Sequence, residues 1–295
     1  MQNDKINLSL IIPIGLMLFS FFFGAGNLIF PPVLGQMAGE NISWGMLGFC
    51  LSGVGFPLLG VLTMAMKQSD NPDSIAMPMH PLYARAVTIL CALAIGPLFA
   101  IPRTAAVSFD TGIHSLLTAS CEAITVFFFV LTYFFSINPS KIIGHIGKFL
   151  SPMLLICLAV LVVCVFVNPT GSLKMPNPDF AASPFFRGFQ EGYNTMDLLA
   201  AILFGSITIK AIEAQGITDK KVLTKLCSYA GLIAAFFLAI IYAALAYTGA
   251  LSINVFGVIP NGATLLSKIC TYYMGFGGQV VLALIIFFAC LTTSI

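Results

Sequence analysis

Long runs of hydrophobic residues, separated by short polar connections, dominate the pattern of this 295-residue chain. A helix needs about 20 apolar residues to cross the hydrocarbon core of a bilayer. Several runs reach that length, and we expect a spanning helix in each of residues 8–35, 44–66, 84–109, 119–137, 148–167, 193–213, 226–250 and 273–295. The pattern therefore predicts an all-α membrane protein with about eight transmembrane helices.

Composition supports a lipid bilayer as the solvent of this chain. Charged residues make up 8% and hydrophobic residues 59% of the sequence, whereas soluble domains contain about 25% charged residues. The net charge of +2 and the lack of a basic cluster exclude a nucleic-acid partner. The cysteines lie mostly in apolar runs without a CxxC pair, so we interpret them as packing residues and expect no cofactor.

Lysine and arginine favour cytoplasmic connections, which sets the expected orientation. With the N-terminus inside, the inner connections hold most of the 13 basic residues. Arg103 lies within a run. The first run is longer than the apolar core of a signal peptide, about 7–15 residues, so we expect it to be retained as the first span. The prediction is a multi-pass membrane protein with a cytoplasmic N-terminus.

The first run contains a predicted helix break at Gly24, Ala25, Gly26 and Asn27, followed by two prolines. Glycine is unfavourable inside a helix, and broken backbone in a bilayer is tolerated where it lines a wet or protein-enclosed cavity. Amides at the start of the following half-helix would suit a carboxylate. The alternative interpretation of the two glycines is close packing between helices.

A second predicted break lies at Gly205–Ser206 in the sixth run. Two interrupted spans at corresponding positions of two halves indicate a transporter binding site. Carbonyls released before Gly205 would suit an ammonium group, so the pair of breaks favours a zwitterionic amino acid. Apolar surroundings favour an apolar side chain. The predicted substrate-binding residues are Gly24, Ala25, Gly26, Asn27, Phe204, Gly205 and Ser206.

If the sixth run begins a second copy of the first, the repeat unit has five helices and the two copies are inverted. Residues 8–167 would form the first repeat, 168–192 an extracytoplasmic connection, and 193–295 an incomplete second repeat within one transmembrane domain. Only three of the five helices of the second copy are then present. We therefore expect this chain to be C-terminally truncated.

The expected coupling ion is Na⁺ rather than H⁺, because no acidic residue falls near the middle of a run and proton-driven carriers use intramembrane carboxylates or histidines. Ala289, Thr292 and Thr293 share one helix face at i, i+3 and i+4. Their oxygens could meet carbonyls released before Gly24. Alternatively, each threonine hydroxyl bonds its own preceding turn. Arg103 is a gate candidate, or it forms a structural bridge to Asp110.

Five segments resemble the bacterial branched-chain amino acid:cation symporters (BrnQ/LIVCS family). They are FGAGNLIFPP (23–32), GPLFAIPRTAAVSF (96–109), GYNTMD (192–197), NGA (261–263) and FACLTTSI (288–295). The resemblance implies Na⁺- or H⁺-coupled uptake of leucine, isoleucine and valine across the bacterial cytoplasmic membrane, and a five-plus-five inverted-repeat (APC/LeuT-like) fold. It also implies a Na⁺ site formed by Ser20, Phe23, Ala289, Thr292 and Thr293.

The function that we expect from the sequence is secondary active transport by alternating access. The alternative is a non-transporting remnant of such a carrier, because family members have about twelve spans. An intramembrane enzyme would need convergent acids, bases or metal ligands, and none is visible in the sequence. A channel would need a ring of charge or a pore-loop signature, which is also absent from the sequence.

Overall fold

The computed structural model describes residues 8–108, 121–137 and 143–295, and the described residues form helices and connections without a β-strand. The first predicted span is divided into α1 (Leu8–Phe22) and α2 (Ala25–Ala38). Gly24 between them is extended, with φ −102° and ψ −168°. The helix therefore breaks at the first of the two predicted positions.

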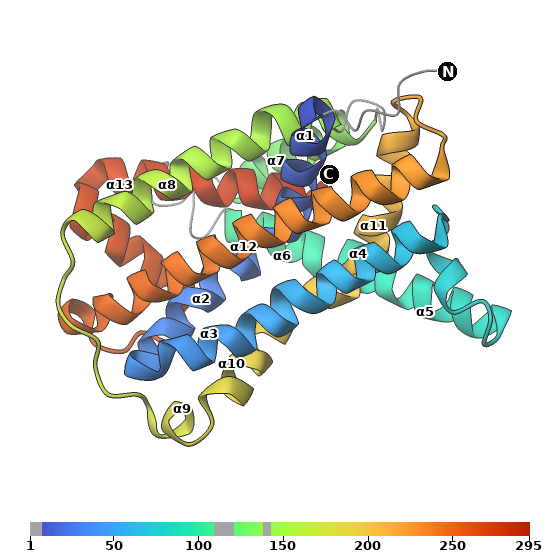
Figure 1. Ribbon diagram of the computed structural model, residues 1–295. Coiled ribbons are helices and arrows are strands. Elements are labelled where there is room, and N and C mark those ends of the chain that lie inside the picture. Colours follow the sequence, from blue (N-terminus) through green and yellow to red (C-terminus); the bar gives the residue numbers. More distant parts are fainter. Residues whose placement is uncertain (1–7, 109–120, 138–142) are drawn as a thin grey trace.

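After α2 the chain turns at Gly39, which adopts a positive φ of 50°. A short 3₁₀ turn, η1 (Gly39–Asn41), leads into a long second helix. This helix consists of α3 (Ile42–Cys50), a π turn, η2 (Leu51–Gly55), and α4 (Phe56–Lys67). Figure 1 shows the α3–α4 helix running beside α2, as expected for two spans joined by a tight connection.

The other elements cover the remaining predicted spans and their connections. They are η3 (Pro72–Ile75), α5 (Pro81–Leu93), η4 (Ala94–Leu98), α6 (Ala100–Val107), α7 (Cys121–Ser136), η7 (Ile143–Leu150), α8 (Ser151–Val167), α9 (Pro178–Ala182), α10 (Pro184–Tyr193), α11 (Asp197–Glu213), α12 (Lys220–Phe256) and α13 (Gly262–Ser294). Helix α13 is kinked at Gly275, where φ is +56°. The final predicted span, 273–295, corresponds to the part of α13 that begins near this kink.

The second predicted break is in the wrong place. Helix α11 continues through Gly205 and Ser206. A Cβ on Gly205 would lie 3.1 Å from the Met64 side chain, so this glycine serves close packing against α4. The Ser206 hydroxyl donates to the backbone carbonyl of Asp70. From the sequence, close helix packing is the alternative interpretation of Gly24 and Gly26. Close packing explains the glycine at position 205.

The second break instead lies between α10 and α11, which meet at an angle of 47°. Met196, directly before α11, has a positive φ of 66°. The left-handed region is uncommon for a residue other than glycine. The helix bend is therefore several residues N-terminal to the predicted one, inside the GYNTMD segment.

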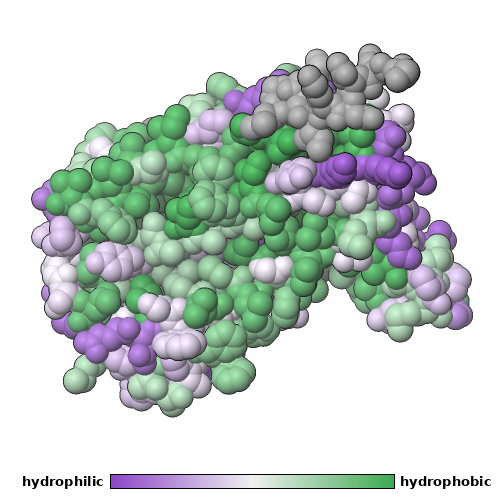
Figure 2. All heavy atoms as spheres, in the orientation of Figure 1, coloured by the Kyte–Doolittle hydropathy of each residue, from purple (hydrophilic) through white to green (hydrophobic). Residues whose placement is uncertain are grey.

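The described residues contain five helices that are long and apolar enough to cross a membrane, or six if α10 and α11 form one bent span. Two shorter apolar helices cover Leu10–Phe22 and Glu122–Ser136. Figure 2 shows hydrophobic residues over the middle of the visible face and hydrophilic residues gathered toward two ends. These features fit an all-α membrane protein, and the count of eight spans stays a prediction.

Glycines allow two pairs of helices to approach closely. On the α3–α10 contact, a Cβ on Gly188 would lie 1.8 Å from the Gly45 carbonyl oxygen, and one on Gly48 would lie 2.0 Å from the Phe185 carbonyl oxygen. On the α2–α12 contact, a Cβ on Gly35 would lie 1.8 Å from the Ala246 carbonyl oxygen. These contacts hold α10 against α3 and α2 against α12, and α10 and α2 are the helices that adjoin the two breaks.

We expect Gly188→Ala to destabilise the protein, because the new methyl group would overlap a backbone carbonyl that cannot rotate away. Overpacking of this kind costs about 1–3 kcal/mol. Gly277→Ala is the matched control, since a Cβ there meets no atom within 4 Å and alanine favours the helix. Thermal unfolding in detergent should show a lower midpoint for Gly188→Ala only. Equal midpoints for the two variants would contradict the close helix contact.

Candidate functional site

The break between α1 and α2 has its own hydrogen-bond arrangement. The Phe23 amide still donates to the Phe19 carbonyl at 2.8 Å, so α1 ends with a complete turn. The Gly24 amide donates to the Asn27 side-chain oxygen Oδ1 at 3.2 Å. First-turn amides of a helix have no partner within it. Ala25 and Gly26, the first residues of α2, line a cavity that starts at this break.

Asn27 also connects the first break to the second. Its Nδ2 donates to the Asp197 carboxylate oxygen Oδ2 at 2.5 Å and lies 2.5 Å from the Tyr242 hydroxyl oxygen. The three residues belong to α2, α11 and α12, and all are buried, with exposed fractions of 2%, 5% and 0%. One amide side chain therefore joins both helix breaks to α12.

Sequence reasoning missed the roles of Asp197 and Tyr242. Asp197 lies near the start of the sixth predicted span, 193–213, and the bend before α11 places this residue in the protein interior. Sequence reasoning therefore overlooked an acidic side chain that is buried in the protein beside the first break. The sequence signal that could have located this group is the GYNTMD segment, residues 192–197. Its last residue, Asp197, directly follows Met196, the residue with positive φ.

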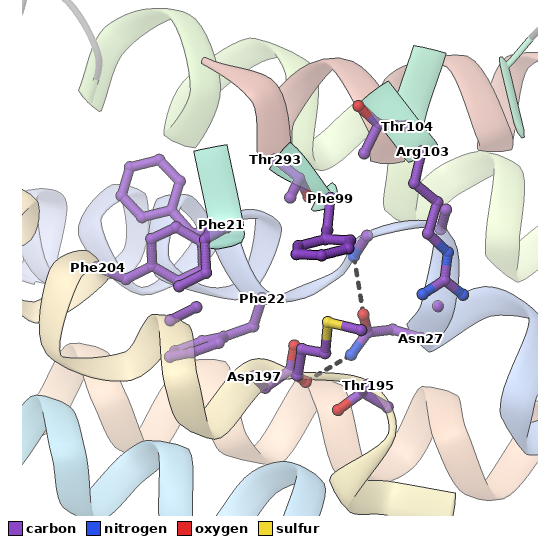
Figure 3. A pocket seen from close by; sticks show the side chains of 16 residues that line it. Phe21, Phe22, Asn27, Phe99, Arg103, Thr104, Thr195, Asp197, Phe204 and Thr293 are labelled. Carbon is purple, nitrogen blue, oxygen red and sulfur yellow. Dashed lines mark hydrogen bonds between the residues drawn. The ribbon is translucent and has the colours of Figure 1, made fainter. Parts of the chain in front are cut away.

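The cavity lies between the two breaks and is walled on one side by aromatic rings (Figure 3). The Phe204 ring centroid is 5.3 Å from those of both Phe21 and Phe22. Asn27 and Asp197 lie between these rings and Arg103 in the view of Figure 3. The cavity volume, measured as the space open to the centre of a water molecule, is about 70 Å³. A single water needs about 10–15 Å³ on this measure, so the cavity has room for several. The cavity can hold a small amphipathic molecule.

The predicted substrate-binding residues separate into two groups. Gly24, Ala25, Gly26, Asn27 and Phe204 all line the cavity. Gly205 and Ser206 do not line it, because they lie on the faces of α11 that pack against α4 and the Asp70 connection. The cavity wall that the sequence assigned to Gly205 is instead formed by Thr195, Met196 and Asp197.

Arg103 of α6 lines the same cavity. Its guanidinium carbon lies 5.6 Å from the centroid of the Phe30 ring, a cation–π distance. A Cβ on Gly26 would lie 3.7 Å from its Nη2 atom, so the cation adjoins the first turn of α2. The suggested partner Asp110 is outside the described residues. A gating role for Arg103 stays a prediction.

Most of the predicted Na⁺ ligands lie around the first break. The Thr292 hydroxyl oxygen is 3.2 Å from the Ser20 carbonyl, and it is also 2.9 and 3.1 Å from the Phe288 and Ala289 carbonyls of its own helix. The hydroxyl therefore bonds its own preceding turn, as in the alternative interpretation, and it also lies beside the Ser20 carbonyl. Its role as an ion ligand stays a prediction. Phe23, the remaining predicted carbonyl ligand, directly precedes Gly24 in the chain.

Thr293 differs from its neighbour. Its Oγ1 atom is buried and has no hydrogen-bond partner among the described residues. A Cβ on Gly24 would lie 3.1 Å from this oxygen, so the hydroxyl faces the break itself. Buried polar atoms normally have partners. In the described part of the chain no cluster of histidine, cysteine and acidic residues could hold a metal, so a cation here would bind neutral oxygens.

We expect Tyr242→Phe to lower stability, because it removes the hydroxyl next to the Asn27 amide and leaves the ring packing with Phe23 and Phe49 intact. Loss of one buried hydrogen bond costs about 0.5–1.5 kcal/mol. The control is Tyr229→Phe, at a residue whose side chain is 48% exposed. Thermal unfolding in detergent should separate the two variants. Indistinguishable midpoints would argue against the buried bridge.

Comparison with known proteins identifies the relatives of this chain. Residues 7–295 match the family described as Branched-chain amino acid transport protein. The chain is 45% identical over its full length to the Branched-chain amino acid permease BrnQ of Bacillus subtilis, of which it covers 68%. Over 96–97% of its length it is 43% identical to permease BraB of the same organism and 38% identical to BrnQ of Escherichia coli, covering 65% of each. The chain thus spans about two thirds of the length of these relatives, and it belongs to the branched-chain amino acid transport protein family, a family of transporters and not of enzymes.

Proposed function

We propose that this protein transports branched-chain amino acids across the bacterial cytoplasmic membrane by Na⁺-coupled symport. The names of its relatives, permeases for branched-chain amino acids, supply the substrate class. The observation that carries the proposal is the cavity between the two helix breaks, which has polar groups beside an aromatic wall. Secondary transporters bind substrates where discontinuous helices meet.

The cavity suits a zwitterion with an apolar side chain. The positive end of the α2 dipole and the first-turn amides at Ala25 and Gly26 favour a carboxylate. The rings of Phe21, Phe22 and Phe204 offer an apolar surface for the substrate side chain. The ammonium group would then face the second break at Thr195–Asp197, in place of the predicted site at Gly205.

We propose Na⁺ as the coupling ion, bound by the carbonyls of Ser20, Phe23 and Ala289 and the hydroxyls of Thr292 and Thr293. The unpartnered Thr293 hydroxyl supports this site, since hard cations prefer oxygen ligands. Coupling to H⁺ is the alternative, and the buried Asp197 carboxyl favours it, because ionisable groups inside membrane spans often carry protons. The threonine site favours Na⁺.

For the fold we propose the five-plus-five inverted repeat with a cytoplasmic N-terminus, working by alternating access. The bent α1–α2 pair covers the first predicted span, and α11 fills the sixth directly after the bend that separates it from α10, so these two bends support the repeat. Residues 8–167 and 193–295 would be the two repeats. A non-transporting chain is the alternative, and the transport assay below separates the two.

Purified protein in proteoliposomes should take up radiolabelled leucine when Na⁺ is high outside, and uptake should fall at least about tenfold without the Na⁺ gradient. Empty liposomes and vesicles with Na⁺ equal on both sides are the controls. Uptake driven by a pH gradient at equal Na⁺ would replace Na⁺ with H⁺ in the proposal. Absence of leucine uptake under every gradient would favour the non-transporting alternative.

Thr293→Val should raise the Na⁺ concentration for half-maximal leucine uptake by about tenfold, the effect of removing roughly 1.4 kcal/mol of binding free energy. Valine keeps the shape of threonine and removes only the hydroxyl. Thr271→Val is the matched control, because Thr271 is exposed and bonds within its own helix, to Ser267. A normal Na⁺ dependence in Thr293→Val would remove this residue from the ion site.

A further inference from the structure

We infer that the Asp197 carboxylate is the receptor for the substrate's α-ammonium group and gives the carrier its selectivity for amines. This inference rests on the proposed transport of amino acids and adds a residue to that site. Asp197 lines the cavity, and its side chain is almost fully buried. It is the first residue of α11, directly after the backbone bend at Met196.

Asp197 has no ion-pair partner in the part of the chain that the structure describes. The ion pairs there are Arg85–Asp73, Arg187–Asp179 and Lys210–Asp70, and none includes Asp197. Its hydrogen-bond donor from α2 is the neutral Asn27 amide. A buried carboxylate is costly unless it is paired, so a cationic ligand in the cavity would supply the missing charge.

The carboxylate is held at a defined place in the cavity. Asn27 contacts it at Oδ2, and Asn27 is itself oriented by the Gly24 amide and the Tyr242 hydroxyl. The Thr195 and Tyr242 side chains also hydrogen-bond this carboxyl group. A carboxylate has about four acceptor sites, so these three neutral partners leave capacity for an ammonium group. Asn27 and Tyr242 are thus positioning residues, and Asp197 is the group that touches the substrate.

The opposite charges of the substrate meet different walls. The carboxylate of an amino acid would lie toward the first turn of α2, near Arg103, whose Nη2 adjoins Gly26. The ammonium would lie toward Asp197 on α11. Only a ligand with both charges satisfies both walls, so an analogue in which a hydroxyl replaces the ammonium should lose the contact with Asp197 and keep the others.

The test is isothermal titration of the purified full chain with L-leucine and with its 2-hydroxy analogue, (S)-2-hydroxy-4-methylpentanoate, at saturating Na⁺. The wild type should prefer leucine by about 30-fold or more, the usual effect of losing one partner of a buried charge pair. Asp197→Asn should weaken leucine binding by a similar factor and leave the hydroxy acid within about threefold, as expected for the loss of a contact to one ligand only. Asp197→Glu should keep the preference for the amine.

Asp219→Asn is the matched control, because this exposed aspartate caps the start of α12 and does not line the cavity. Equal losses for both ligands in Asp197→Asn would assign Asp197 a structural role and overturn the inference. A wild type that binds both ligands equally would overturn it without any variant. If leucine binding to Asp197→Asn no longer depends on Na⁺ while the preference for leucine over the hydroxy acid is unchanged, the Asp197 carboxylate would be assigned to the ion instead.

The two proposals can fail separately. If the wild type binds leucine and Asp197→Asn binds it equally well, only the assignment of Asp197 to the ammonium group is overturned. A wild type that neither binds nor takes up leucine would remove the proposed substrate and the inference with it.

Discussion

The structure depends on the way in which a broken helix satisfies its backbone in the interior. Unpaired amides cannot be hydrated in the hydrocarbon core, so a break there needs protein partners or a polar cavity. Asn27 provides one such partner, because its side-chain oxygen accepts from the Gly24 amide. The nitrogen of the same side chain reaches Asp197 and Tyr242. The same side chain therefore ties the first break to the start of α11 and the middle of α12.

Close helix packing gives this arrangement its rigidity. Glycines let α2 approach α12 and let α10 approach α3 until backbone atoms are in contact. Helix association in lipid relies on such packing, since apolar side chains gain little by leaving lipid tails. Gln36 adds a polar link at the far end of α2, with its side-chain nitrogen 2.9 Å from the Ser252 hydroxyl and its oxygen accepting from the Ile259 amide. The first break is thus followed by α2, which is packed tightly against α12, and the second break is preceded by α10, which is packed tightly against α3.

Gly24 is the point at which the two proposed sites meet. Its amide is held by Asn27, which contacts Asp197, and its Cα faces the hydroxyl of Thr293. A cation beside Thr293 and an amino acid beside Asp197 would therefore contact the same short stretch of extended backbone. This proximity offers a physical basis for coupling, because each ligand would stabilise one conformation of the break and favour the binding of the other.

Several features followed from the sequence alone. Long apolar runs predicted an all-helical membrane protein. The Gly24–Asn27 cluster predicted the first break, because glycine loses more backbone conformational entropy in a helix than other residues do. The periodicity of Ala289, Thr292 and Thr293 also indicated a shared helix face, and the structure brings Thr292 and Thr293 to the first break. These are local properties, which depend on neighbouring residues in the chain.

Tertiary structure decided the rest. A glycine can permit a break or a close contact, and only the position of Met64 shows that Gly205 serves contact. Likewise, Asp197 is near the end of an apolar run in the sequence, and only the bend at Met196 and the approach of Asn27 from 170 positions away make it a buried group in the cavity. Burial and long-range hydrogen bonds depend on which helices meet, and no local pattern in a single sequence contains that information.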